Sequence, residues 1–117
     1  MSFVKPFAPY GEQWSRLGDY GWRVTRLVAL SKDLPVLEIP LAHVNMSYTY
    51  GDMILRELTG HMRAALDADL SFPIILDECG DIMDGRHRLM KAILDDADTI
   101  KAVRFEENPS PCRNYDE

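Results

Sequence analysis

The chain has 117 residues, is 46% hydrophobic and carries a net charge of −6, which predicts a globular domain rather than a disordered chain. No apolar run approaches the ~20 residues of a membrane-spanning helix, and residues 1–10 lack the apolar core of a signal peptide. The two cysteines, Cys79 and Cys112, match no zinc spacing, so we expect a reduced, cytoplasmic protein with no membrane partner.

The first third of the chain predicts an aromatic arm followed by two strands. Residues 1–21 are rich in aromatic, proline and glycine residues, and we expect them to pack on the domain or to form a homodimer with a second copy. Residues 22–30 alternate in polarity, which predicts a strand. Residues 36–39 form a second short apolar run, and the turn signal between the two predicts a hairpin.

A polar, tyrosine-rich loop and the clearest helix follow. The loop covers residues 41–50; it either lines a site or is an ordinary solvated loop. Residues 52–67 carry apolar side chains at spacings of three and four, which predicts a helix with its stripe in the core. Gly60 lies inside this helix, and we expect close packing against another backbone to explain it.

The last part of the chain predicts a compact strand and helix pattern. Residues 73–77 and 82–84 read as a tight hairpin, residues 86–95 as a helix and residues 99–105 as a final strand. We therefore predict an α+β fold with a small mixed β-sheet and two main helices. Its domain spans residues 22–105, between the arm at 1–21 and a polar tail at 106–117.

The junction of the hairpin with the helix carries the strongest functional signal. Gly85 has no Cβ, so the backbone can approach a ligand closely there. Arg86, His87 and Arg88 follow at the helix start, where the dipole favours acids over bases. A cluster of bases at this position suits a bound phosphate or carboxylate, and we expect the three side chains to surround it. The alternative is that both arginines pair with nearby acids, although surface pairs contribute only ~0–1 kcal/mol.

The same residues resemble a known superfamily. The strand at 73–77, the motif Asp-Gly-Arg-His-Arg at 84–88 and the strand at 100–103 are similar, in order and spacing, to the ParB N-terminal/sulfiredoxin-like superfamily. The resemblance implies that Gly85, Arg86, His87 and Arg88 hold nucleotide phosphates.

The resemblance also implies roles for several carboxylates. Asp84 would shape the turn, act in catalysis or bind magnesium, and Glu38 would serve as catalytic base, with Asp52 as the next candidate. Sulfiredoxins carry their reactive cysteine where this chain has Arg86, which argues against sulfinic-acid repair.

These observations favour a protein that binds a nucleoside di- or triphosphate with magnesium, and whether it is an enzyme stays open. As an enzyme it would be a small phosphotransferase or nucleotide hydrolase. The alternative is a non-catalytic regulatory or protein-interaction module. DNA is an unexpected partner because the chain is acidic, and a nucleic-acid-processing role is favoured only if a basic groove forms in three dimensions.

Overall fold

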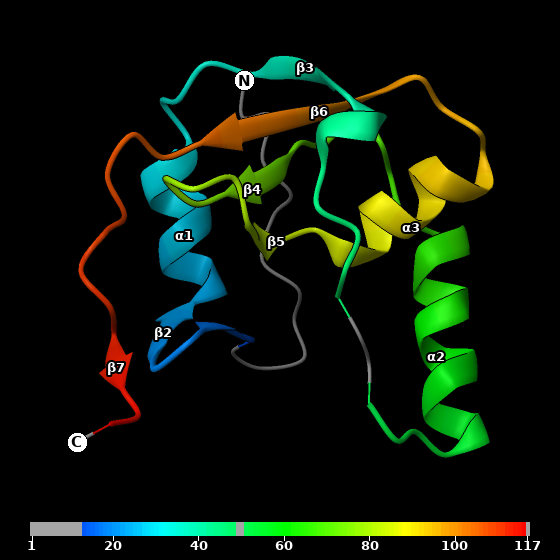
Figure 1. The fold of residues 1–117 in the computed structure, drawn as a ribbon, viewed down its shortest axis with the longest axis horizontal. Helices are drawn as coiled ribbons and strands as arrows, with labels where there is room; N and C mark the ends of the chain where they lie inside the picture. Colours follow the sequence, from blue (N-terminus) through cyan, green and yellow to red (C-terminus); the bar gives the residue numbers. More distant parts are fainter. Residues whose placement is uncertain (1–12, 49–50, 117) are drawn as a thin grey trace.

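The computed structural model describes residues 13–48 and 51–116, which form an α+β fold, as predicted (Figure 1). The strands are β1 (Trp14–Leu17), β2 (Tyr20–Arg23), β3 (Leu37–Pro40), β4 (Ile74–Leu76), β5 (Ile82–Asp84), β6 (Thr99–Arg104) and β7 (Arg113–Asn114). The helices are α1 (Val24–Ser31), the short 3-10 helix η1 (Leu41–His43), α2 (Leu55–Leu66) and α3 (Arg86–Leu94). Within these described ranges, no helix is long and apolar enough to cross a membrane.

The larger sheet has the strand order β3-β6-β4-β5 and matches the predicted mixed sheet. β4 runs parallel to β6 and antiparallel to β5, while β3 pairs antiparallel with β6. All three residues of β4 are buried, as expected for a strand covered on both faces. The strands predicted at 73–77, 82–84 and 99–105 and the helix predicted at 86–95 are confirmed to within two residues at each end.

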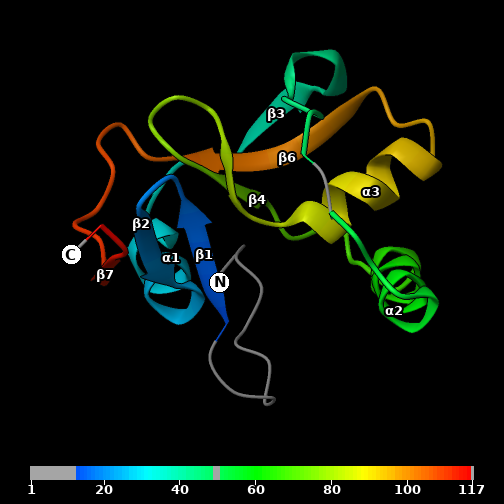
Figure 2. The same cartoon turned by 60° about the horizontal axis from the view of Figure 1, so that its bottom comes forward.

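Alternate residues of the sheet belong to two apolar clusters, one on each face. Ile74 packs in the cluster that contains Leu89 of α3, whereas its neighbour Ile75 packs in the cluster that contains Leu27 of α1 and Trp22. The sheet is therefore the middle layer between α3 and α1. In Figures 1 and 2, α1 lies well apart from α2 and α3.

The strand predicted at residues 22–30 is wrong. β2 ends at Arg23 and the chain continues as α1, whose fully buried residues Leu27 and Ser31 are four positions apart. The alternating pattern of this segment also contains that helical spacing, and contact with the sheet selects the helix. The predicted hairpin with residues 36–39 is consequently wrong as well, since β3 pairs with β6 instead.

The second sheet joins segments predicted as arm and tail. β2 pairs antiparallel with both β1 and β7, and the Trp22 indole N–H donates a hydrogen bond of 2.9 Å to the carbonyl of Pro109. The end of the predicted polar tail is thus part of the fold. Residues 1–12 of the predicted arm lie outside the described residues, and a homodimer through that arm stays a prediction.

The apolar stripe of α2 does not enter the core as expected. Its large apolar side chains are exposed, with Leu55 78%, Met62 53% and Leu66 60% accessible. The buried residue of α2 is Ala65, and the helix packs on α3. A Cβ at Gly60 would meet no atom within 4 Å, so close packing does not explain that glycine.

Candidate anion-binding site

The junction of β5 with α3 is built on a glycine that no other residue replaces easily. Gly85 has φ 110° and ψ 24° and is the residue before the first turn of α3. A Cβ at this position would lie 2.6 Å from Cγ2 of Ile74. Gly85 has no side chain to cap the helix start, and the first backbone N–H groups of α3 have no acceptor within the helix, so they point at the space before it.

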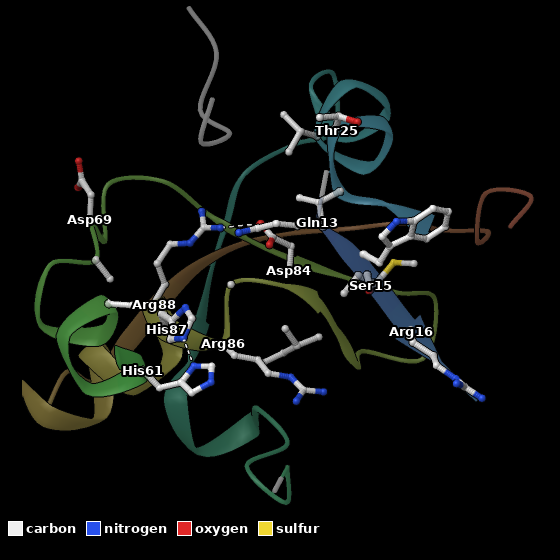
Figure 3. A pocket seen from close by; sticks show the side chains of 18 of the residues that line it. Gln13, Ser15, Arg16, Thr25, His61, Asp69, Asp84, Arg86, His87 and Arg88 are labelled. Atoms are coloured by element: carbon white, nitrogen blue, oxygen red, sulfur yellow. Dashed lines mark hydrogen bonds and ion pairs between the residues drawn. The ribbon is translucent and has the colours of Figure 1, made fainter. Parts of the chain in front are cut away.

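That space is a cavity of about 760 Å³. β5 forms its floor, β1 and α1 form one wall, and α2 and α3 form the other (Figure 3). Among its polar lining residues are Gln13, Ser15, Arg16, Thr25, His61, Asp67, Asp69, Asp84, Arg86, His87 and Arg88. The predicted motif at residues 84–88 therefore lines a cavity of ligand size.

Arg88 has partners within the protein. Its side chain is buried, one guanidinium nitrogen donates a 2.7 Å hydrogen bond to the carbonyl of Pro73, and the other forms a 2.7 Å ion pair with Asp84. Burial lowers the pKa of Arg88, while the Asp84 carboxylate acts in the opposite direction. The guanidinium remains charged at physiological pH, and it ties the start of α3 to the end of β5.

Arg86 is held in a different way. Its guanidinium carbon lies 4.6 Å from the centre of the Tyr48 ring, a distance typical of a cation–π contact. The Tyr48 hydroxyl accepts a 2.8 Å hydrogen bond from the Ile82 N–H, and burial raises the pKa of this phenol. The tyrosine-rich loop thus contributes to the site through Tyr48.

His87 faces a histidine that the sequence analysis did not single out. Nδ1 of His61, on α2, lies 2.8 Å from Nε2 of His87, and the two rings stack with centroids 5.1 Å apart. One ring must donate and the other accept at this distance. The only sequence signal for His61 was its position next to the apolar stripe of α2, which does not distinguish a site residue from a surface residue.

The predicted convergence of three side chains on one anion is not observed. In Figure 3 the guanidinium groups of Arg86 and Arg88 point in different directions, and His87 faces His61. The alternative of arginines paired with acids holds for Arg88, which binds Asp84. Arg86 forms no ion pair with any carboxylate in the described part of the chain.

The predicted bases do not lie with the motif. Glu38 is exposed on β3, opposite Lys101 of β6, at the sheet edge farthest from β5. Neither Glu38 nor Asp52 lines the cavity. The acids that do line it are Asp84 and the exposed pair Asp67 and Asp69.

The predicted magnesium site stays a prediction, because Mg²⁺ needs only one or two protein carboxylates beside phosphate oxygens. In residues 13–48 and 51–116, no group of three or more His, Cys, Asp and Glu side chains is placed to hold a metal ion. Asp84, the predicted ligand, is engaged by Arg88. The carboxylate of Asp69 accepts hydrogen bonds from the backbone N–H and hydroxyl of Ser71, which lower its pKa.

Comparison of the chain with protein-family models, with curated proteins and with solved structures found no match in any of the three.

Proposed function

We propose that the protein binds the phosphate group of a small molecule, in first place a nucleotide, at the start of α3. The observation that carries the proposal is the helix start after Gly85, a residue with no side chain to cap it, beside a cavity lined by Arg86 and His87. Backbone N–H groups at a helix start and the positive end of its dipole favour an anion there.

The roles within the motif follow from the contacts. Arg86 supplies the positive charge for the anion, because its guanidinium has an aromatic partner and no carboxylate partner among the described residues. Arg88 and Asp84 position the helix start by binding each other. His87 supplies an imidazole beside the anion, held in place by His61.

The ligand class rests on cavity size and on resemblance. A volume of about 760 Å³ is within the range of small-molecule sites and accommodates a nucleoside di- or triphosphate. The motif Asp-Gly-Arg-His-Arg, in its strand–turn–helix setting, is consistent with a ParB/sulfiredoxin-like protein. Because the described residues supply no preformed magnesium site, we propose that any magnesium arrives with the nucleotide rather than being held by the protein.

Binding without turnover is the stronger form of the proposal. Phosphoryl transfer needs a positioned base beside the phosphate, and neither Glu38 nor Asp52 lines the cavity. Of the acids that do line it, Asp84 is paired with Arg88, and Asp67 and Asp69 are exposed. A regulatory or interaction module that senses a nucleotide therefore fits better than a phosphotransferase or hydrolase. We propose a cytoplasmic location, where the free thiols of Cys79 and Cys112 persist.

Thermal unfolding with ATP, ADP, CTP, GTP and tripolyphosphate, each with and without Mg²⁺, tests the proposal. A ligand at 100 times its Kd stabilises the folded state by about 2.7 kcal/mol. Arg86→Gln is expected to abolish the stabilisation, and His87→Gln to reduce it. Arg56→Gln, which removes the same charge from an exposed position on α2 outside the cavity, is expected to leave it unchanged.

The absence of stabilisation by every phosphate compound overturns the proposal. Stabilisation that survives Arg86→Gln also contradicts it, since the anion would then bind elsewhere. If binding is found, release of inorganic phosphate from the bound nucleotide separates the enzyme from the module.

A further inference from the structure

The outer face of the smaller sheet gathers arginines and aromatic rings from three strands. Cross-strand register places Trp14 opposite Arg23, and it places Gly21 opposite both Arg16 and Arg113. Tyr115 follows β7 and lies over Gly21, where a Cβ would be 2.8 Å from its ring. We call this the Arg–aromatic face: Trp14, Arg16, Arg23, Arg113 and Tyr115.

The guanidinium groups of this face lie on its rings. Those of Arg16 and Arg113 are 4.0 and 5.3 Å from the centre of the Tyr115 ring. Those of Arg23 and Arg113 are 5.7 and 6.0 Å from the Trp14 ring. Such contacts hold the arginine side chains along the sheet, while Trp14 stays 42% exposed.

Among the residues that the structure describes, no carboxylate balances the charge of this face. In the described part of the chain, none of Arg16, Arg23 and Arg113 has a carboxylate within 4.0 Å. Asp19, in the β1–β2 turn, and Asp116, after β7, are each three positions from one of these arginines but form no ion pair with them. Three like charges brought together in a protein of net charge −6 repel one another, and an external polyanion would relieve that repulsion.

We propose that the Arg–aromatic face binds single-stranded nucleic acid. Guanidinium groups contact the phosphates, and bases stack on the exposed Trp14 ring and on the arginine planes. An acidic peptide would pair with the arginines but make no use of the rings. A duplex would require a wider basic surface than a chain of net charge −6 offers.

This inference does not rest on the phosphate site at α3. Trp14 and Arg16 also contribute to the rim of the cavity, but the Arg16 side chain points away from Arg86 and His87 in Figure 3. The two surfaces therefore adjoin while using different cations. A variant at Arg86 separates them.

Fluorescence anisotropy of a labelled oligothymidylate of about 15 nucleotides, titrated with the full chain at low salt, tests the proposal. Trp14→Ser is expected to weaken binding about tenfold. The double variant Arg23→Gln/Arg113→Gln is expected to lower the slope of log K against log salt by about 1.4, as for two phosphates of a single strand. The double variant Arg56→Gln/Arg63→Gln, with the same charge change on α2, and Arg86→Gln are expected to bind within about twofold of the wild type.

A second readout needs no destabilising substitution. Trp22 is 3% exposed, so an oligonucleotide that stacks on this face is expected to quench the fluorescence of Trp14, and Trp14→Phe is expected to remove the quenching. The proposal is overturned by no binding of the wild type at low salt, by equal weakening in the α2 control, or by loss of binding in Arg86→Gln. Equal competition by polyglutamate and by unlabelled oligonucleotide also overturns it, in favour of an acidic peptide.

Discussion

The imidazole rings of His61 and His87 stack across the contact between α2 and α3, with Nδ1 of His61 2.8 Å from Nε2 of His87. The two residues are 26 positions apart in the chain, and their hydrogen bond joins a helix with an exposed apolar stripe to the helix that starts the proposed site. We predict that this pair contributes to the docking of α2.

A double-mutant cycle measures that contribution. His61→Ala and His87→Ala are each expected to lower the free energy of unfolding, with a coupling energy of about 1 kcal/mol between them. Chemical denaturation of the wild type, both single variants and the double variant gives the value. Strictly additive effects would mean that the two rings touch without stabilising the helix contact.

Two glycines are expected to respond in opposite directions to the same substitution. Gly85→Ala places a Cβ 2.6 Å from Ile74 at φ 110°, so it should destabilise the fold by about 2–4 kcal/mol. Gly60→Ala meets no atom within 4 Å inside α2, so it should stabilise by about 0.5–1 kcal/mol. Thermal unfolding of the two variants checks the pair, and a neutral Gly85→Ala would contradict the strained geometry of the β5–α3 junction.

We predict that the main role of Arg88 is to stabilise the fold. Arg88→Met leaves Asp84 without its ion pair and the Pro73 carbonyl without its donor, and should cost about 3 kcal/mol of stability. Arg63→Met, at an exposed position on α2, should change stability by less than about 0.5 kcal/mol. Urea denaturation distinguishes them. If Arg88→Met proves as stable as the wild type, the Arg88–Asp84 pair does not hold α3 in place.

Cys112 is predicted to react as a thiolate at lower pH than an ordinary cysteine. Burial opposes its ionisation, but the Arg23 N–H and the Arg26 guanidinium, each 3.4 Å from Sγ, lower the pKa of the thiol. In a Cys79→Ser background, the rate of alkylation by iodoacetamide should reach its midpoint at a lower pH in the folded protein than in the urea-unfolded chain. Arg26→Ala should move the midpoint upward.

The same shift has a consequence for stability. Because the folded-state pKa of Cys112 is depressed, the stabilisation by its thiolate is present above the unfolded-state pKa and is lost as the pH falls through the folded-state pKa. Arg26→Ala should therefore lose more stability relative to the wild type at alkaline pH than at pH 7. An equal loss at both would show that Arg26 acts only through its bond to the Ser110 carbonyl.

Much of the fold around the site could be predicted because its signals are local. Three buried apolar residues in β4, the glycine before α3 and the apolar spacing of α3 each restrict the backbone near themselves. The segment after Trp22 could not be predicted in this way. Its apolar residues fit a strand and a helix about equally, and burial of Leu27 against the sheet decides between them.

The candidate site could be predicted only in part, because the sequence shows its local motif but not its contacts with distant segments. The motif at residues 84–88 identified the helix start and the residues that surround it. The sequence could not show that Arg88 would bind Asp84 or that His61 would meet His87, because these contacts depend on how α2 and β5 are placed around α3. Glu38 is the opposite case. It lies in the early strand, as expected, but that strand is at the sheet edge opposite β5, far from the motif.

The α+β class, the mixed sheet and the glycine before α3 follow from the sequence, since they depend on apolar periodicity and backbone sterics. The proposal of an anion at Gly85–Arg86 also starts from the sequence, from the basic residues at a helix start. The tertiary structure alone decided which arginine is engaged internally, which histidines meet, and that β1, β2 and β7 present three arginines on one face. These features depend on contacts between segments that are distant in the chain, and no local pattern of residues encodes such contacts.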